Sequence, residues 1–239
     1  MTLLAALLPA FGFGQPTVNS GGVVNAASFT APVAPGSLIS IYGVNLAPGT
    51  AVAPSLPLPT ALNGTTVSIN GIAAPLLFVS AGQINAQVPF EVQPGSATLQ
   101  IQAGTLQGAP VTFKVQAIAP GVLSVVQNAA DGTVNSPQAP VQPGQYVTVY
   151  VTGQGTVDPS VPTGAAAPAG PFALPLAVVQ AQIGGQDATV TFAGLAPELA
   201  GLMQVNLLLP AVPPGDQPLV VTVGGVPSNT VTVSVGAGQ

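Results

Sequence analysis

The chain has 239 residues, of which 48% are hydrophobic and only 3% are charged, with a net charge of −5. The apolar content excludes charge-driven disorder, and Lys114, as the single basic residue, excludes electrostatic binding of nucleic acid. The absence of His, Cys and Arg removes most acid–base, nucleophilic and thiolate metal chemistry, so we expect no enzyme and assign no catalytic residue, cofactor or metal site.

The first predicted element is an N-terminal apolar segment. Residues 1–13 read MTLLAALLPAFGF, a run too short to span a bilayer. Small residues at 12 and 14 have the spacing that signal peptidase favours, although a basic n-region is missing. We interpret 1–14 as a signal peptide, with a buried first strand as the alternative. Pro and Gly interrupt every later apolar stretch, so we expect no transmembrane span and a secreted or cell-surface protein.

Short β-strands are predicted along the rest of the chain. The 29 Gly and 27 Pro separate alternating segments rich in β-branched residues, and helical periodicity is absent over any useful length. The last segment shows the alternation clearly, because valines at 231, 233 and 235 face one way and Thr232 and Ser234 the other. The clearest strands are 38–42, 67–69, 111–115, 146–151 and 231–235.

The two halves of the sequence repeat one plan. Five blocks recur in the same order, which indicates a tandem duplication. Repeats of this length, with about seven short strands each, predict an all-β protein of two tandem immunoglobulin-like β-sandwich domains. The short join at 117–121 divides them into 15–117 and 118–239 and favours a fixed angle. The paired blocks are 35–42 with 143–150, 69–78 with 183–192, 83–89 with 204–210, 94–101 with 214–223, and 111–115 with 231–235.

Five motifs carry a resemblance to a known family. They are VNAASF at 24–29, VAPGS at 33–37, LPLPT at 56–60, QINAQVP at 83–89 and GGVPSN at 224–229. Together they are similar to the uncharacterised C-terminal domain of secreted proteins from Solibacter and related Acidobacteria, over about 24–235. Each half is also loosely similar to the IPT/TIG type of immunoglobulin-like domain. The resemblance implies a secreted accessory module and brings no catalytic residue.

Two polar features could bind a ligand. Asp131 opens the run DGTVN at 131–135, whose oxygens could meet calcium, but calcium usually takes several carboxylates, so we favour an Asp-Gly turn. Gln83 and Asn85 recur as Gln204 and Asn206. A polar groove is one interpretation of this repeat, and a structural hydrogen-bonding strand is the simpler one.

The tyrosines alternate with core residues. Tyr42 and Tyr150 occupy equivalent places on the face opposite Ile41 and Val149, and Tyr146 joins Tyr150. Exposed aromatic side chains at this spacing could stack on sugars. We expect instead that they pack against the other sheet.

The remaining charged residues show no catalytic spacing. Lys114 is expected to be solvated on its strand, and no Ser-x-x-Lys motif is present. The loop from 157 through 171 is the longest irregular stretch, and its lack of polar groups predicts that it covers a core or a partner. The carboxylates Asp158, Asp187, Glu198 and Asp216 lie in separate segments.

Together these features predict a non-catalytic extracellular binding or spacer module of two tandem Ig-like domains, whose partner is an extracellular protein or polysaccharide. The alternative is a self-assembling structural subunit of an extracellular fibre or surface layer. A nearly uncharged surface offers little repulsion between chains, and open sheet edges can pair with one another.

Overall fold

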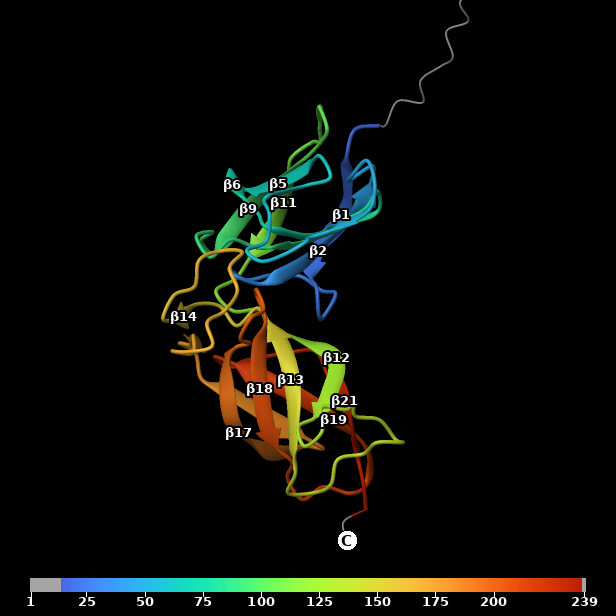
Figure 1. The fold of residues 1–239 in the computed structure, drawn as a ribbon, viewed down its shortest axis with the longest axis vertical. Helices are drawn as coiled ribbons and strands as arrows, with labels where there is room; N and C mark the ends of the chain where they lie inside the picture. The colour runs from blue at the N-terminus through green and yellow to red at the C-terminus, as the bar shows by residue number, and fades with distance from the viewer. Residues whose placement is uncertain (1–13, 238–239) are drawn as a thin grey trace, which may run out of the picture.

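The computed structural model describes residues 14–237, which form strands and loops without a helix. Two β-sandwiches are stacked end to end along the long axis of the molecule (Figure 1). The predicted all-β fold of tandem immunoglobulin-like sandwiches is therefore confirmed. The predicted signal peptide lies outside the described residues except for Gly14. Within 14–237 there is no helix long and apolar enough to cross a membrane.

The first sandwich has two separate sheets. One has the order β1-β2-β8-β7-β3, and the other has the order β10-β9-β5-β4, with β11 paired to β9 and β6 to β5. The strands are β1 (Thr17–Asn25), β2 (Leu38–Val44), β3 (Ala51–Val52), β4 (Ala61–Leu62), β5 (Thr65–Ile69), β6 (Ile72–Ala73), β7 (Leu76–Val79), β8 (Gln83–Gln87), β9 (Gly95–Ala103), β10 (Leu106–Gln107) and β11 (Val111–Val115).

In the second sandwich the strands join into one sheet, with the order β12-β13-β18-β17-β16-β19-β20, and β21 pairs with β19. The short strands β14 and β15 form a separate pair. The strands are β12 (Gly121–Asn128), β13 (Tyr146–Thr152), β14 (Val157–Asp158), β15 (Leu174–Pro175), β16 (Val179–Ile183), β17 (Gln186–Leu195), β18 (Met203–Leu208), β19 (Gly215–Val223), β20 (Val226–Pro227) and β21 (Val231–Val235).

Strand β17 explains this difference between the sandwiches. Its first residues pair with β16 and its later residues pair with β18. One continuous sheet therefore passes through β17 from one face of the sandwich to the other. In the first sandwich β6 pairs with β5 and β7 pairs with β8, and Pro75 lies between β6 and β7. Because proline has no N–H to donate to a strand ladder, the two sheets of the first sandwich are not joined at this point.

The core of each sandwich comes from the alternation of its strands. Ile39 and Ile41 of β2 and Val147 and Val149 of β13 are fully buried. The buried side chains form two clusters, one drawn from 23–115 and the other from 122–235. The repeated blocks lie in the same register, because β2 pairs with β8 as β13 pairs with β18. Each sandwich therefore has its own core.

One turn of the first sandwich holds an unusual residue. Phe29 has φ 57° and its N–H donates to the carbonyl of Asn25 at 2.9 Å. In the second sandwich Gly132, with φ 72°, makes the same bond to Asn128 at 2.9 Å. Glycine adopts positive φ without strain, whereas a bulky residue does not. Phe29 is 62% exposed, so packing offsets little of this strain.

We therefore expect the Phe29→Gly variant to be more stable than the natural chain by about 0.5–1 kcal/mol. Glycine relieves the left-handed strain, and the larger entropy that it gives the unfolded state offsets part of this gain. Urea denaturation followed by circular dichroism measures the difference. The Gly132→Phe variant should lose stability. A less stable Phe29→Gly variant would mean that the ring packs against the protein in solution.

Candidate functional site

The two sandwiches are joined by three sets of hydrogen bonds, which we call the interdomain seam. The first set lies at the linker, where Asn25 Nδ2 donates to the carbonyl of Ala119 at 2.9 Å. The Oδ1 atom of Asn25 accepts the N–H of Ala27 at 2.8 Å, and the side chain is buried. This amide therefore ties the end of β1 to the start of the second sandwich.

The second set is centred on Thr152, the last residue of β13. Its Oγ1 accepts the N–H of Leu38 from the first sandwich at 2.8 Å and donates to the carbonyl of Gly201 at 2.8 Å. Thr152 is fully buried. A Cβ atom at Gly201 would lie 2.7 Å from Leu38 Cδ2, so a larger residue there would displace the Leu38 side chain where the two sandwiches meet.

The third set comes from loop 159–173, between β14 and β15, which lies at the junction in Figure 1. The N–H of Gly164 donates to Gln87 Oε1 at 2.7 Å, and the carbonyl of Gly164 accepts the N–H of Leu58 at 2.8 Å. The Gln87 side chain is buried, and its Nε2 donates to the carbonyl of Gly36 at 3.1 Å. The surface that this loop covers thus belongs to the same chain.

Thr163 extends the contact of this loop with the first sandwich. Its Oγ1 accepts the N–H of Phe90 at 3.0 Å and donates to Glu91 Oε2 at 2.8 Å. Farther along, the N–H of Ala167 donates to the carbonyl of Leu199 at 2.9 Å, which anchors the loop on its own sandwich. The seam is therefore attached at β1, β2, β8 and the segments before β4 and after β8. Attachments spread in this way oppose both bending and twisting of the linker.

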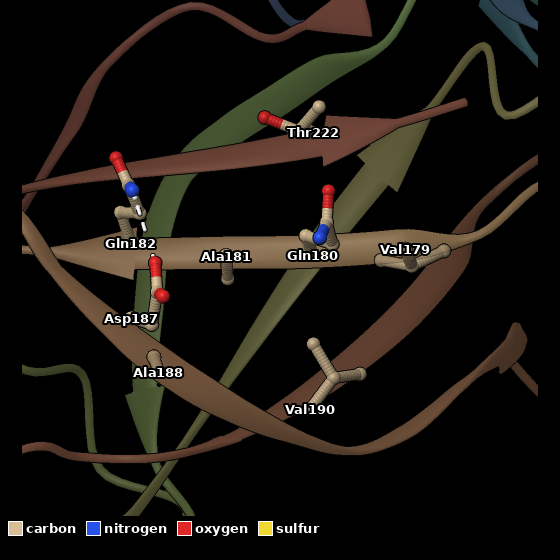
Figure 2. Close-up of a pocket in the computed structure, with 8 residues that line it drawn as sticks. All are labelled: Val179, Gln180, Ala181, Gln182, Asp187, Ala188, Val190 and Thr222. Atoms are coloured by element: carbon tan, nitrogen blue, oxygen red, sulfur yellow. Dashed lines mark hydrogen bonds between the residues drawn. The ribbon is translucent and has the colours of Figure 1, made fainter. Parts of the chain in front are cut away.

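A second feature is the cleft of Figure 2, of about 460 Å³, where β16 and β17 separate. The strands pair at Ala181 and Ala188 and then diverge. Gln182 Nε2 donates to Asp187 Oδ1 at 3.0 Å, and Thr222 lines the cleft from β19. The lining has a single carboxylate, that of Asp187, which already accepts a hydrogen bond from an amide, and it has no second acid or base. Its chemistry is limited to hydrogen bonding.

A third feature, the apolar strip, consists of Phe172, Leu174, Leu176 and Val178. They are 45%, 46%, 69% and 72% exposed, while Ala173 between them is buried and Pro175 and Ala177 are half-buried. This inverts the usual pattern, in which the large side chains are buried. The Phe172 ring meets Phe192 edge-on, with centroids 5.3 Å apart. Exposed apolar side chains that follow one another along a segment in this way are typical of association surfaces.

Asp131 fixes a turn, as expected. Its Oδ1 accepts the Thr133 N–H at 3.0 Å and the Thr133 hydroxyl at 2.7 Å. The backbone hydrogen bond first, and the hydroxyl second, hold the pKa of Asp131 below its ordinary value. In the part of the chain that the structure describes, no group of three or more His, Cys, Asp or Glu side chains could hold a metal ion. The Asp-Gly turn accounts for this motif.

The lowered pKa of Asp131 predicts a pH dependence. A carboxyl whose pKa is lower in the folded state stabilises the fold above its unfolded pKa and loses this effect as the pH falls through the folded pKa. We therefore expect the Thr133 amide resonance to stay constant from pH 7 to 5 and to titrate below 3.8, the ordinary value. NMR titration measures this, and Asp131→Asn should abolish it. A midpoint at or above 3.8 would contradict the hydrogen-bonded turn.

The repeated Gln and Asn side chains form matching ladders on the outer faces of the two sandwiches. In each ladder the Asn Oδ1 atom accepts a hydroxyl from the neighbouring strand and an amide from two residues earlier. This confirms the interpretation as structural hydrogen-bonding strands. The bonds are Ser40 Oγ to Asn85 Oδ1 (3.2 Å), Gln83 Nε2 to Asn85 Oδ1 (2.7 Å), Thr148 Oγ1 to Asn206 Oδ1 (3.0 Å) and Gln204 Nε2 to Asn206 Oδ1 (3.0 Å).

The prediction that the tyrosines pack against the opposite sheet is wrong. Tyr42 and Tyr150 are half-buried on the outer faces, and Tyr146 is 46% exposed. The inward positions are taken by Ile41 and Val149, and the period of two then directs the tyrosines outward. They lie beside the polar ladders instead of in the cores.

The remaining candidates do not form a shared site. Lys114 is exposed on β11, as predicted. The four carboxylates lie on different elements, with Asp158 on β14, Asp187 on β17, Glu198 in the loop after β17, and Asp216 on β19. The sequence reasoning missed Gln87 and Thr152, two common polar residues without a distinctive motif.

The match to a known family concerns the first half of the chain. The model of the IPT/TIG domain family matches residues 23–115, which confirms the IPT/TIG likeness over that part. The likeness to the Solibacter and Acidobacteria domain stays a prediction. No curated protein matches the chain.

Several solved structures are similar at low identity. The surface glycan-binding protein SGBP-B of Bacteroides ovatus, solved with a mixed-linkage heptasaccharide, is 15% identical, and the match covers 85% of this chain and 43% of that chain with a TM-score of 0.35. The Escherichia coli adhesin FdeC is 19% identical over 95% of this chain and 67% of that chain, with a TM-score of 0.29. Domains 5–6 of the S-layer protein SbsC are 17% identical over 92% of this chain and 98% of that chain, with a TM-score of 0.28. The chain thus spans less than half of the glycan-binding protein, and no function is taken from these likenesses.

Proposed function

We propose that the chain is a non-catalytic extracellular module that binds a partner or spaces two partners, with domains 15–117 and 118–239 held at one angle. The interdomain seam is the main support. Domains joined by a linker usually move relative to one another, whereas here buried hydrogen bonds at Asn25, Thr152 and Gly164 restrain both bending and twisting. The near absence of acid–base side chains supports a role without catalysis.

Small-angle X-ray scattering of the purified chain, combined with pull-down from envelope extracts and polysaccharides, tests this function. One rigid arrangement should fit the scattering, a surface component should be retained, and no hydrolase activity should appear. Scattering that requires a broad range of interdomain angles would refute the rigid module. A panel of extracts and polysaccharides without any retained component would count against binding.

The alternative, a self-assembling structural subunit, is supported by the apolar strip. We expect that Leu176→Lys combined with Val178→Lys weakens self-association at least tenfold, because the two side chains are 69% and 72% exposed and charge opposes their burial. Sedimentation velocity over a concentration series measures it. Val44→Lys with Val52→Lys is the matched control, since these valines are 56% and 68% exposed on the first sandwich. A natural chain that stays monomeric at high concentration would exclude assembly.

A further inference from the structure

A pocket of about 350 Å³ opens at the junction of the two sandwiches, beside the linker. The first sandwich contributes Ser28, Thr30 and Pro32, the linker side contributes Gln116, and the second sandwich contributes Pro227 and Asn229. None of the residues that line the pocket is charged. The pocket is therefore suited to a neutral ligand with both apolar and hydroxyl surfaces, and its volume is in the range of small-molecule sites.

Phe29 lies between two residues of the pocket lining, Ser28 and Thr30. Its ring is 62% exposed and contributes little to the core, and its φ of 57° is one that bulky residues avoid. The equivalent turn of the second sandwich has Gly132. Strained residues retained without a packing role are typical of binding sites. The first copy thus bears the strain at a turn whose residues on either side line the pocket, while Phe29 itself is exposed and is not part of the lining.

The polar atoms of the lining divide into two groups. The Asn229 amide is occupied, since its Oδ1 accepts the N–H of Val122 at 2.8 Å and its Nδ2 donates to the carbonyl of Val122 at 3.0 Å. The hydroxyls of Ser28 and Thr30 share one hydrogen bond of 2.9 Å, and each keeps further bonding capacity. The amide of Gln116 is half-buried in the same lining and offers both a donor and an acceptor.

We infer that this junction pocket binds a neutral saccharide. A pyranose ring has an apolar C–H face that stacks on an aromatic side chain, and hydroxyls that pair with amide and hydroxyl groups. Phe29 supplies the stacking face, and Ser28, Thr30 and Gln116 supply the hydrogen bonds. The inference rests on the proposed function as a binding module and names the class of ligand. Because both sandwiches line the pocket, its shape depends on the fixed interdomain angle.

NMR titration of the whole chain with neutral probes, cellohexaose, laminarihexaose, xylohexaose and mannohexaose, tests the inference, with trigalacturonate as the charged probe. At least one neutral probe should shift the amide resonances of Ser28, Thr30 and Gln116, and trigalacturonate should not. Phe29→Gly should weaken binding at least tenfold without lowering the melting temperature. Gln116→Leu should weaken it severalfold. Tyr146→Ala should leave it unchanged, because Tyr146 is an exposed aromatic residue at the start of β13, at the other end of that strand from Thr152 of the seam.

Several outcomes would overturn the saccharide site. One is that none of the neutral probes shifts these amides, and another is that affinity is unchanged in Phe29→Gly. Equal binding of trigalacturonate would also overturn it, because the pocket would then not select neutral ligands. If scattering still shows one fixed angle and an envelope component is still retained, the proposed function stands while the pocket is refuted. A chain without a fixed angle or any retained component refutes the module itself.

Discussion

Replacing Thr152 by Val should lower the free energy of unfolding by about 2–3 kcal/mol and widen the range of angles between the two sandwiches. Valine has the shape of threonine but lacks the hydroxyl that links the N–H of Leu38 to the carbonyl of Gly201. Each buried group that loses its partner costs about 1–3 kcal/mol. Urea denaturation measures the stability, and small-angle scattering measures the spread of interdomain angles.

Two variants control this experiment. Thr152→Ser keeps the hydroxyl and should keep the fixed angle, with a smaller loss of stability. Val44, at the end of β2, occupies the place in the first sandwich that Thr152 has in the second, and it is 56% exposed. Val44→Thr should therefore leave stability and angle unchanged. If Thr152→Val and the natural chain have the same scattering, the hydroxyl does not hold the seam.

Replacing Gly164 by Ala should lower the free energy of unfolding by about 2–3 kcal/mol and detach loop 159–173 from the first sandwich. Gly164 has φ 80°, which costs an L-residue about 1–2 kcal/mol. The added Cβ would also lie 3.0 Å from Pro75 Cγ and 3.3 Å from the carbonyl oxygen of Leu58. This crowding should weaken the hydrogen bonds of Gly164 to Gln87 and Leu58. Faster hydrogen exchange of the Leu58 amide would report the detachment.

Gly185 offers a matched control for Gly164. Its φ is 78°, and nothing lies within 4 Å of a Cβ built there. Gly185→Ala should therefore cost only the backbone strain, about 1 kcal/mol, and leave the interdomain angle unchanged. If both alanine variants have equal stability and equal Leu58 exchange, loop 159–173 does not hold the seam.

Much of the fold follows from local patterns. The alternation of Val231 to Val235 predicts one buried and one outward face, and the inward valines are indeed buried. Of the two outward residues Thr232 is exposed, whereas Ser234 is buried beneath Asn135 and Asp216, to which it is hydrogen-bonded. Asn70-Gly71 and Gly184-Gly185 have the composition of two-residue hairpin turns, and all four residues have the positive φ that such turns need. The orientation of the tyrosines was predicted wrongly, because their aromatic character suggested burial. Ile41 and Val149 already take the inward positions, so the period of two places Tyr42 and Tyr150 on the outer face.

The seam could not be predicted in this way. Leu38 and Thr152 are 114 positions apart, and Gln87 and Gly164 are 77 apart, so no local pattern connects them. The one available signal was a difference between the copies, Thr152 where the first half has Val44. A second difference, Phe29 where the second half has Gly132, depends on knowing that both residues have positive φ.

By itself, the sequence determined that this is an all-β chain of two similar halves with almost no reactive side chains. These properties depend on residue type and short-range periodicity, which any segment carries by itself. Only the tertiary structure decided how the two sandwiches meet, which surface loop 159–173 covers, and that Ser28 and Thr30, on either side of Phe29, line a neutral pocket. These features arise from contacts between distant segments, made by common residues such as Thr, Gln and Gly that gain their roles only when the chain brings them together.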